Sequence, residues 1–374
     1  MTSSHETDGL RVAIDGTSLI GKRTGVGHVT AGFLQALSRR DDLSLVVFAV
    51  TWRGRRSLAG VLPARIRAAT APIPARIARR TWPRLDVPIV EHWTGPVDVV
   101  HAPNFVAPPA DVPVMLTIHD LTFVRHPEMC TPDALTYPRL IAHALDRGAH
   151  VHVVSDFVGA EVKRHFNLPA ERVTRVYPGI ATMEQGDPHS GHLIAGAALY
   201  VLVLGSIEPR KNLPAFVRAF DRVAATHPEL HLVVAGPDGW DVGAFTVACS
   251  VARHRDRIRR LGYVTDAERR DLLAGATAFA YPSHYEGFGH PPLEAMSVNI
   301  PVLAGRAGAL PEVLDDAALF VDPRDDDDLA AQLDRILTDE ALRAELRARG
   351  RSRLEAFSWA HAADELSALY HRIA

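Results

Sequence analysis

The sequence predicts an α/β fold made of two parallel-sheet domains. Short apolar runs typical of strands alternate with segments of helical periodicity, and this alternation occurs twice along the chain. A stretch rich in Gly, His, Asp and Ser, residues 181–196, separates the two sets and is expected to be an interdomain linker. The length of 374 residues also favours two domains over one. Strands that alternate with helices form parallel sheets covered on both faces, so we expect two such domains with a cleft between them.

In the first half, the predicted strands are short and end in polar residues. They are expected at residues 11–14, 43–50, 97–101, 114–119, 150–155 and 173–177. A loop that contains glycines, residues 21–27, follows the first of them and precedes a helix expected from His28 to Ser38. Ligands in open α/β sheets bind at the carboxyl ends of strands, so polar residues there are candidates for a site.

In the second half, the alternation starts afresh. Strands are expected at residues 199–204, 231–235, 258–264, 276–281, 301–304 and 319–321, and helices at 213–226, at 266–274 and from Pro291 onwards. Thr265 is placed to cap the second of these helices. The acidic run Asp325–Asp328 suits a helix N-terminus, which favours negative charge, better than a metal site. Amphipathic helices are expected to finish the chain.

Composition limits where the protein is expected to act. No run of 18 apolar residues is present, and the polar stretch Met1–Leu10 lacks the apolar core of a signal peptide. The two cysteines, Cys130 and Cys249, are far apart, which argues against a disulfide framework or a cysteine-based metal site. We therefore expect a cytoplasmic protein.

Positive charge is concentrated in residues 52–84. This segment has no acidic residue and carries nine arginines, with Trp52 and Trp82 among them. One interpretation is a solvated basic surface. The other is a patch that contacts an anionic membrane, such as the inner face of the cell membrane, or a phosphorylated acceptor. Nucleic acid is not expected as a partner, because the net charge is −3 and no nucleic-acid-binding motif is present.

The stretch 281–296 carries the strongest signal for chemistry. It places Glu286 and Glu294 on either side of a loop with Gly287 and Gly289 and a Pro-Pro step that suits a helix start. An apolar run precedes it, so the layout is strand, tight loop, helix. Free amides at such a helix start bind phosphorylated ligands, and the carboxylates can hold the hydroxyls of a sugar or ribose. The alternative is a helix-start loop with solvated acids.

A second motif, residues 205–212, directly follows a predicted strand. Arg210 and Lys211 lie on its loop, where two cations can neutralise a diphosphate and stabilise it as a leaving group. Plain surface charge is the alternative interpretation.

Two features of the first half are weaker candidates. His119 ends a predicted strand and could touch a ligand or be an ordinary loop histidine. Gly25 and Gly27 open a predicted helix, but short glycine loops are common.

Taken together, these motifs resemble the family-four retaining glycosyltransferases of the GT-B architecture. The motifs that carry the resemblance are the Glu286-x7-Glu294 frame, Glu208-Pro-Arg-Lys-Asn212, Thr117-Ile-His-Asp120, Gly25-Val-Gly27 and Phe357-Ser-Trp359. The resemblance covers nearly the whole chain. It implies an acceptor-binding Rossmann-like domain at residues 1–185, a nucleotide-sugar-binding Rossmann-like domain at 186–356, and a C-terminal helix at 357–374 that crosses back to the first domain.

The resemblance also implies roles for the residues of the second domain. Glu294 would bind the ribose hydroxyls of the donor, and Glu286 would hold the donor sugar together with Gly287, Phe288 and Gly289.

Further implied roles fall on the remaining candidates. Arg210 and Lys211 would bind the diphosphate and act in catalysis with Glu286. Ser206 stands where many members of the family have arginine, which places more of that task on these two cations. The other implied contacts are His119 with the transferring sugar, Gly25 and Gly27 with the phosphate or acceptor, and the backbone of Tyr263 and Val264 with the base.

The implied reaction is transfer of a hexose from a nucleotide sugar to an acceptor hydroxyl with retention at the anomeric carbon. No metal and no cofactor are expected. Similarity to bacterial mannosyltransferases makes GDP-mannose the first choice of donor, while UDP-glucose, UDP-GlcNAc and dTDP-rhamnose stay open. The acceptor is open as well, and the basic segment favours a lipid-linked or anionic one.

Three other functions are alternatives to this one. A UDP-sugar epimerase of similar shape would share the base site but would need an acid/base pair at the sugar. A nicotinamide oxidoreductase is disfavoured because Gly25-Val-Gly27 is followed by Thr30, so the dinucleotide fingerprint is absent. A catalytically silent nucleotide-sugar-binding protein would need to have lost site residues that are all present here.

Overall fold

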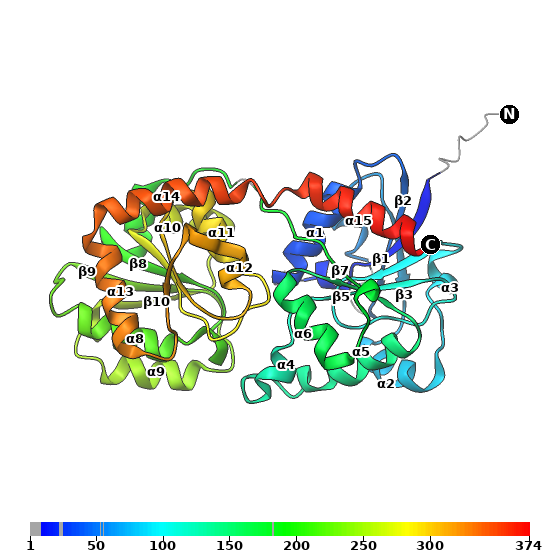
Figure 1. Cartoon of the computed structure of the whole chain (residues 1–374), viewed down its shortest axis with the longest axis horizontal. Helices are drawn as coiled ribbons and strands as arrows, with labels where there is room; N and C mark the ends of the chain where they lie inside the picture. The colour runs from blue at the N-terminus through cyan, green and yellow to red at the C-terminus, as the bar shows by residue number, and fades with distance from the viewer. Residues whose placement is uncertain (1–8, 22–24, 53, 55, 182) are drawn as a thin grey trace. The chain divides into compact units, whose positions relative to one another are not determined.

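The computed structural model describes residues 9–21, 25–52, 54, 56–181 and 183–374. The chain forms two compact units (Figure 1). Unit 1 contains the chain up to Gly179 together with the segment Phe357–Ala374, and unit 2 contains Ile180–Ala356. The chain therefore leaves unit 1, builds unit 2 and returns to unit 1 at its end.

Unit 1 is built on a seven-stranded sheet with all neighbouring strands parallel. The strand order is β3-β2-β1-β4-β5-β6-β7. The strands are β1 (Leu10–Asp15), β2 (Leu43–Val50), β3 (Arg67–Ala71), β4 (Val99–Ala102), β5 (Val114–Ile118), β6 (His150–Val153) and β7 (Val173–Arg175). Strand β3 was not predicted, because its sequence, Arg-Ala-Ala-Thr-Ala, has few of the large apolar residues that mark a strand.

Helices cover both faces of this sheet, as expected for parallel strands. The helices of unit 1 are α1 (Gly25–Leu37), α2 (Ala75–Leu85), α3 (Glu91–Thr94), α4 (Thr122–Arg125), α5 (Tyr137–Asp146), α6 (Asp156–Phe166) and α15 (Trp359–Ile373). Side chains of β1 alternate between two cores. Val12 and Ile14 pack in the core shared with α1 and α15, whereas Ala13 packs in the core that contains Trp82 of α2.

The C-terminal helix α15 lies beside α1 in unit 1, as predicted (Figure 1). The indole of Trp359 occupies space left free by two glycines. A Cβ at Gly32 would lie 2.2 Å from this ring, and a Cβ at Gly179 would lie 2.4 Å from the Trp359 backbone nitrogen. Phe33 meets the same ring edge to face at 5.2 Å. Close packing of α15 therefore depends on small residues in unit 1.

A buried chain of hydrogen bonds ties α15 to the sheet. Because a carbonyl only accepts, His152 Nε2 must donate to Val176 O (3.1 Å), which makes Nδ1 of the neutral ring an acceptor for the Thr117 hydroxyl (2.8 Å). Thr117 then accepts from His101 Nε2 (2.7 Å), and His101 Nδ1 accepts from the Tyr370 hydroxyl (2.7 Å). Burial lowers the pKa of both histidines, which keeps them neutral and this direction of donation intact.

Unit 2 is built on a six-stranded parallel sheet with the order β10-β9-β8-β11-β12-β13. The strands are β8 (Leu199–Leu204), β9 (Leu230–Ala235), β10 (Ile258–Gly262), β11 (Ala278–Tyr281), β12 (Val302–Gly305) and β13 (Leu319–Val321). Its helices are α7 (Pro188–Ala195), α8 (Leu213–Val223), α9 (Val242–Val251), α10 (Asp266–Gly275), α11 (His290–Ser297), α12 (Leu310–Leu314), α13 (Asp326–Thr338) and α14 (Glu340–Leu354). Thr265 caps α10 and Asp325 caps α13, as predicted.

The prediction of a linker at residues 181–196 is wrong for most of that stretch. Asp187 caps a helix there, α7, which packs against α10 as part of unit 2. Gly191 permits this contact, since a Cβ at that position would lie 2.0 Å from Asp271 O. The boundary between the units falls after Gly179, six residues before the expected domain boundary.

Candidate active site

Glycines end three adjacent strands of unit 2 at the carboxyl edge of the sheet. Gly205 follows β8, Gly236 follows β9 and Gly262 ends β10, with φ of 142°, 148° and 71°. Gly236 donates to Gly262 O at 2.7 Å, and a Cβ on Gly236 would lie 2.1 Å from Gly205 O. A side chain is therefore excluded at Gly236, positive φ favours glycine at all three positions, and the backbone at this edge can approach a ligand closely.

The two predicted diphosphate-binding cations lie on a short turn beside this edge. Pro209, Arg210 and Lys211 form one turn of 3₁₀ helix, which Asn212 ends in a left-handed conformation with φ of 58°. The side-chain amide of Asn212 donates to Pro323 O at 2.6 Å and fixes that end. The short helix thus holds two successive cations in a defined position.

Glu286 binds both cations, although it lies 76 residues after Arg210 and 75 after Lys211. Arg210 Nη1 donates to Glu286 Oε2 at 2.6 Å, and Lys211 Nζ donates to Glu286 Oε1 at 2.6 Å. Arg210 Nε also donates to Glu208 Oε2 at 2.9 Å. These four residues, Glu208, Arg210, Lys211 and Glu286, are called the charge cluster below. Its two positive and two negative charges balance.

Tyr281, the last residue of β11, gives Lys211 a further partner. Lys211 Nζ lies 2.5 Å from the Tyr281 hydroxyl and 4.3 Å from the centre of its ring. Lys211 is only 8% exposed, and a buried ammonium needs such partners to stay charged. Tyr281 therefore orients Lys211.

Burial and charge oppose each other at Glu286. Burial alone would raise the pKa of its carboxyl, but the positive charges of Arg210 and Lys211 outweigh that effect and lower the pKa to about 2. Burial and the nearby Arg210 lower the pKa of Lys211, against the opposing effect of Glu286. Glu286 is thus ionised throughout the physiological range and cannot serve there as a proton donor.

The charge cluster can still receive a ligand. Gly205, Ser206, Lys211, Tyr281 and Ser283 line a narrow recess next to it. An anionic group that entered this recess would meet the positive charge of Lys211.

The loop after Glu286 leads into α11. Gly289 is the residue before this helix, with φ of 107°, and a Cβ there would lie 2.6 Å from a methyl group of Leu310. Gly287 and Phe288 are buried. A neighbouring loop holds this one from outside: Ala309 donates to Glu286 O at 2.8 Å. The predicted sugar-binding loop is therefore tightly constrained.

Glu294, on α11, makes its contact elsewhere. Its Oε2 accepts from Nη2 of Arg269, a residue of α10. Tyr263 and Val264, the predicted base-binding residues, lie between β10 and α10, and Tyr263 is 61% exposed. Glu294 and the segment Tyr263–Val264 are thus linked through α10.

His119 lies in unit 1, directly after β5. Its Nε2 donates to Pro103 O at 2.7 Å, and Phe105 packs edge to face against the ring. Burial lowers the pKa of His119, while the contact with Pro103 and the charge of Asp120 oppose that shift. The neutral ring then presents Nδ1 as an acceptor, which suits a sugar hydroxyl.

Gly25 and Gly27 also lie in unit 1, at the start of α1, which follows the carboxyl end of β1. Gly25 is exposed, and a Cβ there would meet nothing within 4 Å, whereas Gly27 is buried. Their part in binding stays a prediction.

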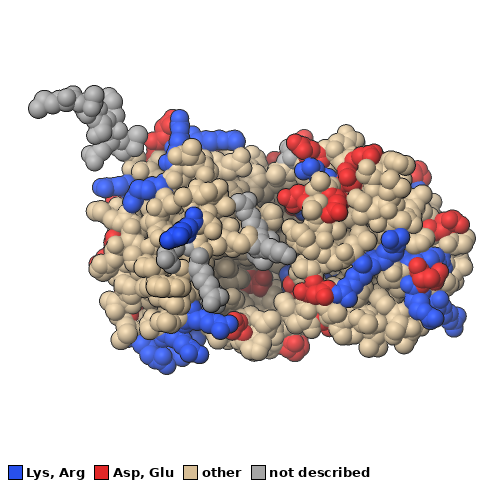
Figure 2. All heavy atoms as spheres, turned by 180° about the vertical axis from the view of Figure 1, so that it is seen from behind, with Lys and Arg blue, Asp and Glu red and all other residues tan. Residues whose placement is uncertain are grey.

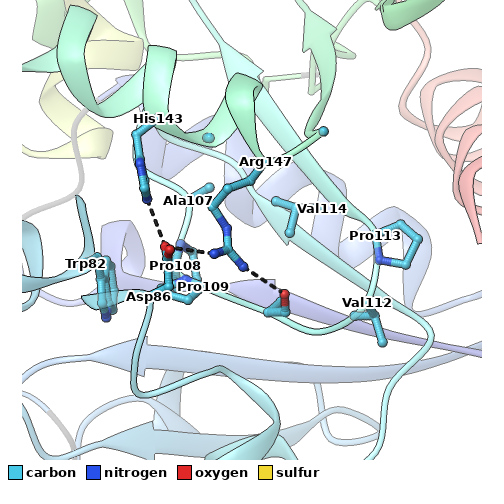
Figure 3. A pocket seen from close by; sticks show the side chains of 13 residues that line it. Trp82, Asp86, Ala107, Pro108, Pro109, Val112, Pro113, Val114, His143 and Arg147 are labelled. Atoms are coloured by element: carbon cyan, nitrogen blue, oxygen red, sulfur yellow. Dashed lines mark hydrogen bonds and ion pairs between the residues drawn. The ribbon is translucent and has the colours of Figure 1, made fainter. Parts of the chain in front are cut away.

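A different recess in unit 1 lies between α2 and α5 (Figure 3). At one side, Asp86 accepts from His143 Nε2 at 2.9 Å and pairs with Arg147 Nη1 at 2.8 Å. The recess borders Val114, the first residue of β5, so it lies at the amino edge of the sheet, opposite the edge that carries His119. No predicted site residue lines it.

The sequence did not indicate two side chains of the site, Tyr281 and Arg269. Tyr281 was named only as the end of a strand, although a tyrosine that ends an apolar strand at a site edge is a signal for a polar role. Arg269 belongs to an Arg-Arg pair in α10, and nothing in that spacing indicates Glu294 as its partner.

Two further observations concern membranes and metals. None of the helices in the described residues combines the length and apolarity needed to span a bilayer. Within the same ranges, no three His, Cys, Asp or Glu side chains converge as metal ligands. Independence from metal stays a prediction.

Comparison with known protein families matches both units. Residues 23–184 match the family described as Glycosyltransferase Family 4, and residues 188–353 match Glycosyl transferases group 1.

Individual proteins show the same similarity. O-antigen chain mannosyltransferase B of Escherichia coli is 34% identical over 272 residues, which cover 70% of this chain and 71% of that protein. The serotype-specific mannosyltransferase WbdA of E. coli is 29% identical over 58% of this chain but only 28% of its own length. The crystal structure of Anabaena HepE in complex with UDP and glucose has the same fold, with a TM-score of 0.74, 17% identity and coverage of 97% of this chain and 100% of HepE.

Proposed function

Because this chain belongs to the GT-B glycosyltransferases that combine a family 4 domain with a group 1 domain, we propose that it transfers a hexose from a nucleotide sugar to an acceptor hydroxyl with retention at the anomeric carbon. The observation that carries the proposal is the charge cluster at the carboxyl edge of unit 2. Its cations lie on a rigid turn beside glycines that leave room for a ligand. This arrangement suits the diphosphate of a nucleotide sugar.

Arg210 and Lys211 act mainly on the leaving group in this proposal. Negative charge grows on the diphosphate as the bond to the sugar breaks, so cations held in place there stabilise the transition state more than the bound donor. The ionised Glu286 keeps both cations oriented and accepts hydroxyl hydrogen bonds from the donor sugar. The leaving diphosphate receives the proton of the acceptor hydroxyl, which attacks from the same face.

We propose that the donor is GDP-mannose and that the transferred sugar is mannose. Relatives named as O-antigen mannosyltransferases support it, since one of them is matched over more than two thirds of its length. They also support a role in polysaccharide biosynthesis. HepE shares the fold and is solved with UDP, which keeps UDP-sugars as the competing choice. His119 contacts the transferring sugar, and Gly25 and Gly27 contact phosphate or acceptor, in the same proposal.

The acceptor is proposed to be lipid-linked or anionic, and α2 supports this. Arg76, Arg80 and Arg84 recur every four residues and are exposed, so they share one side of the helix. Ile77 and Leu85 are 53% and 62% exposed on the adjoining side. Figure 2 shows Lys and Arg gathered at the lower edge of unit 1, where α2 lies. Such a surface fits an anionic membrane.

The first test compares thermal unfolding of the protein with GDP, UDP, dTDP, ADP and NAD. A ligand at 100 times its Kd stabilises by about 2.7 kcal/mol. We expect GDP to stabilise the protein, and Glu294→Ala to remove that effect. Stabilisation by none of them, or by NAD alone, would contradict the proposal. Incubation with UDP-sugars separates the epimerase alternative, because an epimerase yields the epimerised UDP-sugar and no free UDP.

The second test addresses the leaving group. Arg210→Ala is expected to lower kcat about 10²–10³-fold, as does loss of one oxyanion donor elsewhere. Arg218→Ala is the matched control, since Arg218 lies on the next helix and pairs with Asp326 at the surface. Unchanged turnover in the Arg210→Ala, Lys211→Ala double variant would rule out the proposed role of the two cations.

A further inference from the structure

Arg269 and Glu294 form an ion pair between two helices of unit 2. Nη2 of Arg269 donates to Oε2 of Glu294, and the side chains are 25% and 22% exposed. This pair is better shielded from water than a surface ion pair, so its attraction is less screened. Neither the family resemblance nor the comparisons give Arg269 a task.

We propose that Arg269 is a positioning residue that fixes the carboxylate of Glu294 for recognition of the ribose hydroxyls of the donor nucleotide. The inference rests on the proposed function, in which Glu294 binds the ribose.

The pair leaves room for ribose. A carboxylate offers about four acceptor positions on its two oxygens, and the contact with Arg269 is made through Oε2. Oε1 is therefore available for a hydroxyl donor. A side chain already held in one rotamer loses less entropy when it binds, which increases affinity for a ligand that fits it.

Arg269 is itself held in place. It lies in the first turns of α10, whose start is fixed by reciprocal hydrogen bonds between Thr265 and Glu268. Its own backbone amide donates to Thr265 O at 2.9 Å. Tyr263 and Val264, the proposed base-binding residues, directly precede this capped start. One rigid helix therefore connects the base segment to the carboxylate that receives the ribose.

Loss of Arg269 has a defined effect on this arrangement. Glu294 would remain as a largely buried carboxylate without its cation, free to rotate toward water. A site that hydrogen-bonds a hydroxyl discriminates strongly against an analogue that lacks it, and this discrimination depends on a fixed partner. The pair therefore predicts preference for ribonucleotides over 2′-deoxyribonucleotides, and Arg269 controls the size of that preference.

The experiment measures Kd by calorimetry for GDP and 2′-deoxy-GDP, and for UDP and 2′-deoxy-UDP. The proteins are the wild type, Arg269→Gln, Arg269→Lys, Glu294→Gln and the Arg269→Gln, Glu294→Gln double variant. Arg270→Gln is the matched control, because Arg270 is the next residue of α10 and pairs at 3.6 Å with the exposed Glu184. Thermal unfolding checks that each variant is folded.

We expect the wild type and Arg270→Gln to prefer the ribonucleotide about tenfold or more. The preference should fall toward one in Arg269→Gln and in Glu294→Gln, recover in part in Arg269→Lys, and fall no further in the double variant. In steady-state kinetics of Arg269→Gln, the KM for the donor should rise by a larger factor than the factor by which kcat falls.

Other outcomes overturn the inference in distinguishable ways. If Arg269→Gln weakens both nucleotides equally, Arg269 only supports the fold. If Glu294→Gln loses the preference and Arg269→Gln keeps it, the ribose role stands without Arg269. A wild type that binds GDP or UDP without preference removes the ribose role while leaving the transferase. Binding of neither nucleotide would remove the proposed function and the inference with it.

Discussion

At the scale of single residues, Glu286 is the group whose charge matters most. Its carboxylate holds Arg210 and Lys211 at distances of 2.6 Å each. The low pKa of this buried acid affects stability as well as chemistry. The folded protein stabilises the ionised carboxylate more than the unfolded chain does.

Glu286 should make the folded protein more sensitive to acid. The pKa of Glu286 is about 2 in the folded protein against 4.5 for an unperturbed glutamate. Its stabilisation, of the order of 3 kcal/mol, is therefore complete above pH 4.5 and is lost as pH falls toward 2. Urea unfolding of unit 2 at pH 6, 4 and 3 should show a steeper loss for the wild type than for Glu286→Gln.

The control for this comparison is Asp326→Asn, which removes a carboxylate from the surface pair with Arg218. Its pH dependence should follow the wild type. Parallel curves for the wild type and Glu286→Gln would mean that the charge cluster does not stabilise the ionised acid. Glu286→Gln should also be less stable at pH 6, because it removes the carboxylate that pairs with both Arg210 and Lys211.

At the scale of elements, α2 turns a cluster of arginines in the sequence into a surface. Its inner side buries Ala78 and Trp82, so the outward arginines and the exposed Ile77 and Leu85 have fixed places. Arg53 and Arg55, which belong to the same basic segment, lie outside the described residues.

We expect sedimentation with anionic vesicles to capture the protein through α2. Each arginine near such a surface contributes about 1 kcal/mol, so the triple variant Arg76→Gln, Arg80→Gln, Arg84→Gln should bind roughly 100-fold more weakly. Salt should weaken the wild type as well. The matched control, Arg347→Gln, Arg349→Gln, Arg351→Gln on α14, removes the same charge from unit 2. Equal binding of the two triple variants would contradict a membrane role for α2.

Elements also show how far the sequence could predict the fold. The strands at 199–204 and 319–321 match their predicted bounds, because each is a compact apolar run. Helix α7 was mistaken for a linker, since its Gly, His and Ser content hides a helix that packing against α10 stabilises. Asp187 followed by Pro188 was a usable helix-start signal.

The site was also predictable only in part. Adjacent parallel strands bring their carboxyl ends together, and this rule is enough to expect Arg210, Lys211 and Glu286 near one another. The partners of Lys211 and Glu294 could not be predicted, because Tyr281 and Arg269 reach them from β11 and α10 through side-chain placement that spacing does not encode.

At the scale of the whole molecule, the chain closes by returning to the unit in which it began. Unit 1 is complete only with α15, whose Leu366, Leu369 and Tyr370 belong to the same core as β1 and α1. The stability of unit 1 therefore depends on residues that follow unit 2 in the sequence, and the contact of Trp359 with Gly32 is where that dependence can be measured.

The effect of Gly32→Ala on stability should change sign when Trp359 is removed. Gly32→Ala should destabilise the wild type by about 1–3 kcal/mol, because the new methyl would lie 2.2 Å from the indole and must displace it. In a Trp359→Ala background the clash with the indole is absent. There it should stabilise the protein by up to about 1 kcal/mol, since alanine favours a helix interior over glycine. Trp359→Ala alone should cost about 2–3 kcal/mol, less than a fully buried tryptophan. Urea unfolding of the four proteins measures the coupling, and additive effects would mean that α15 is not docked against α1 through this contact.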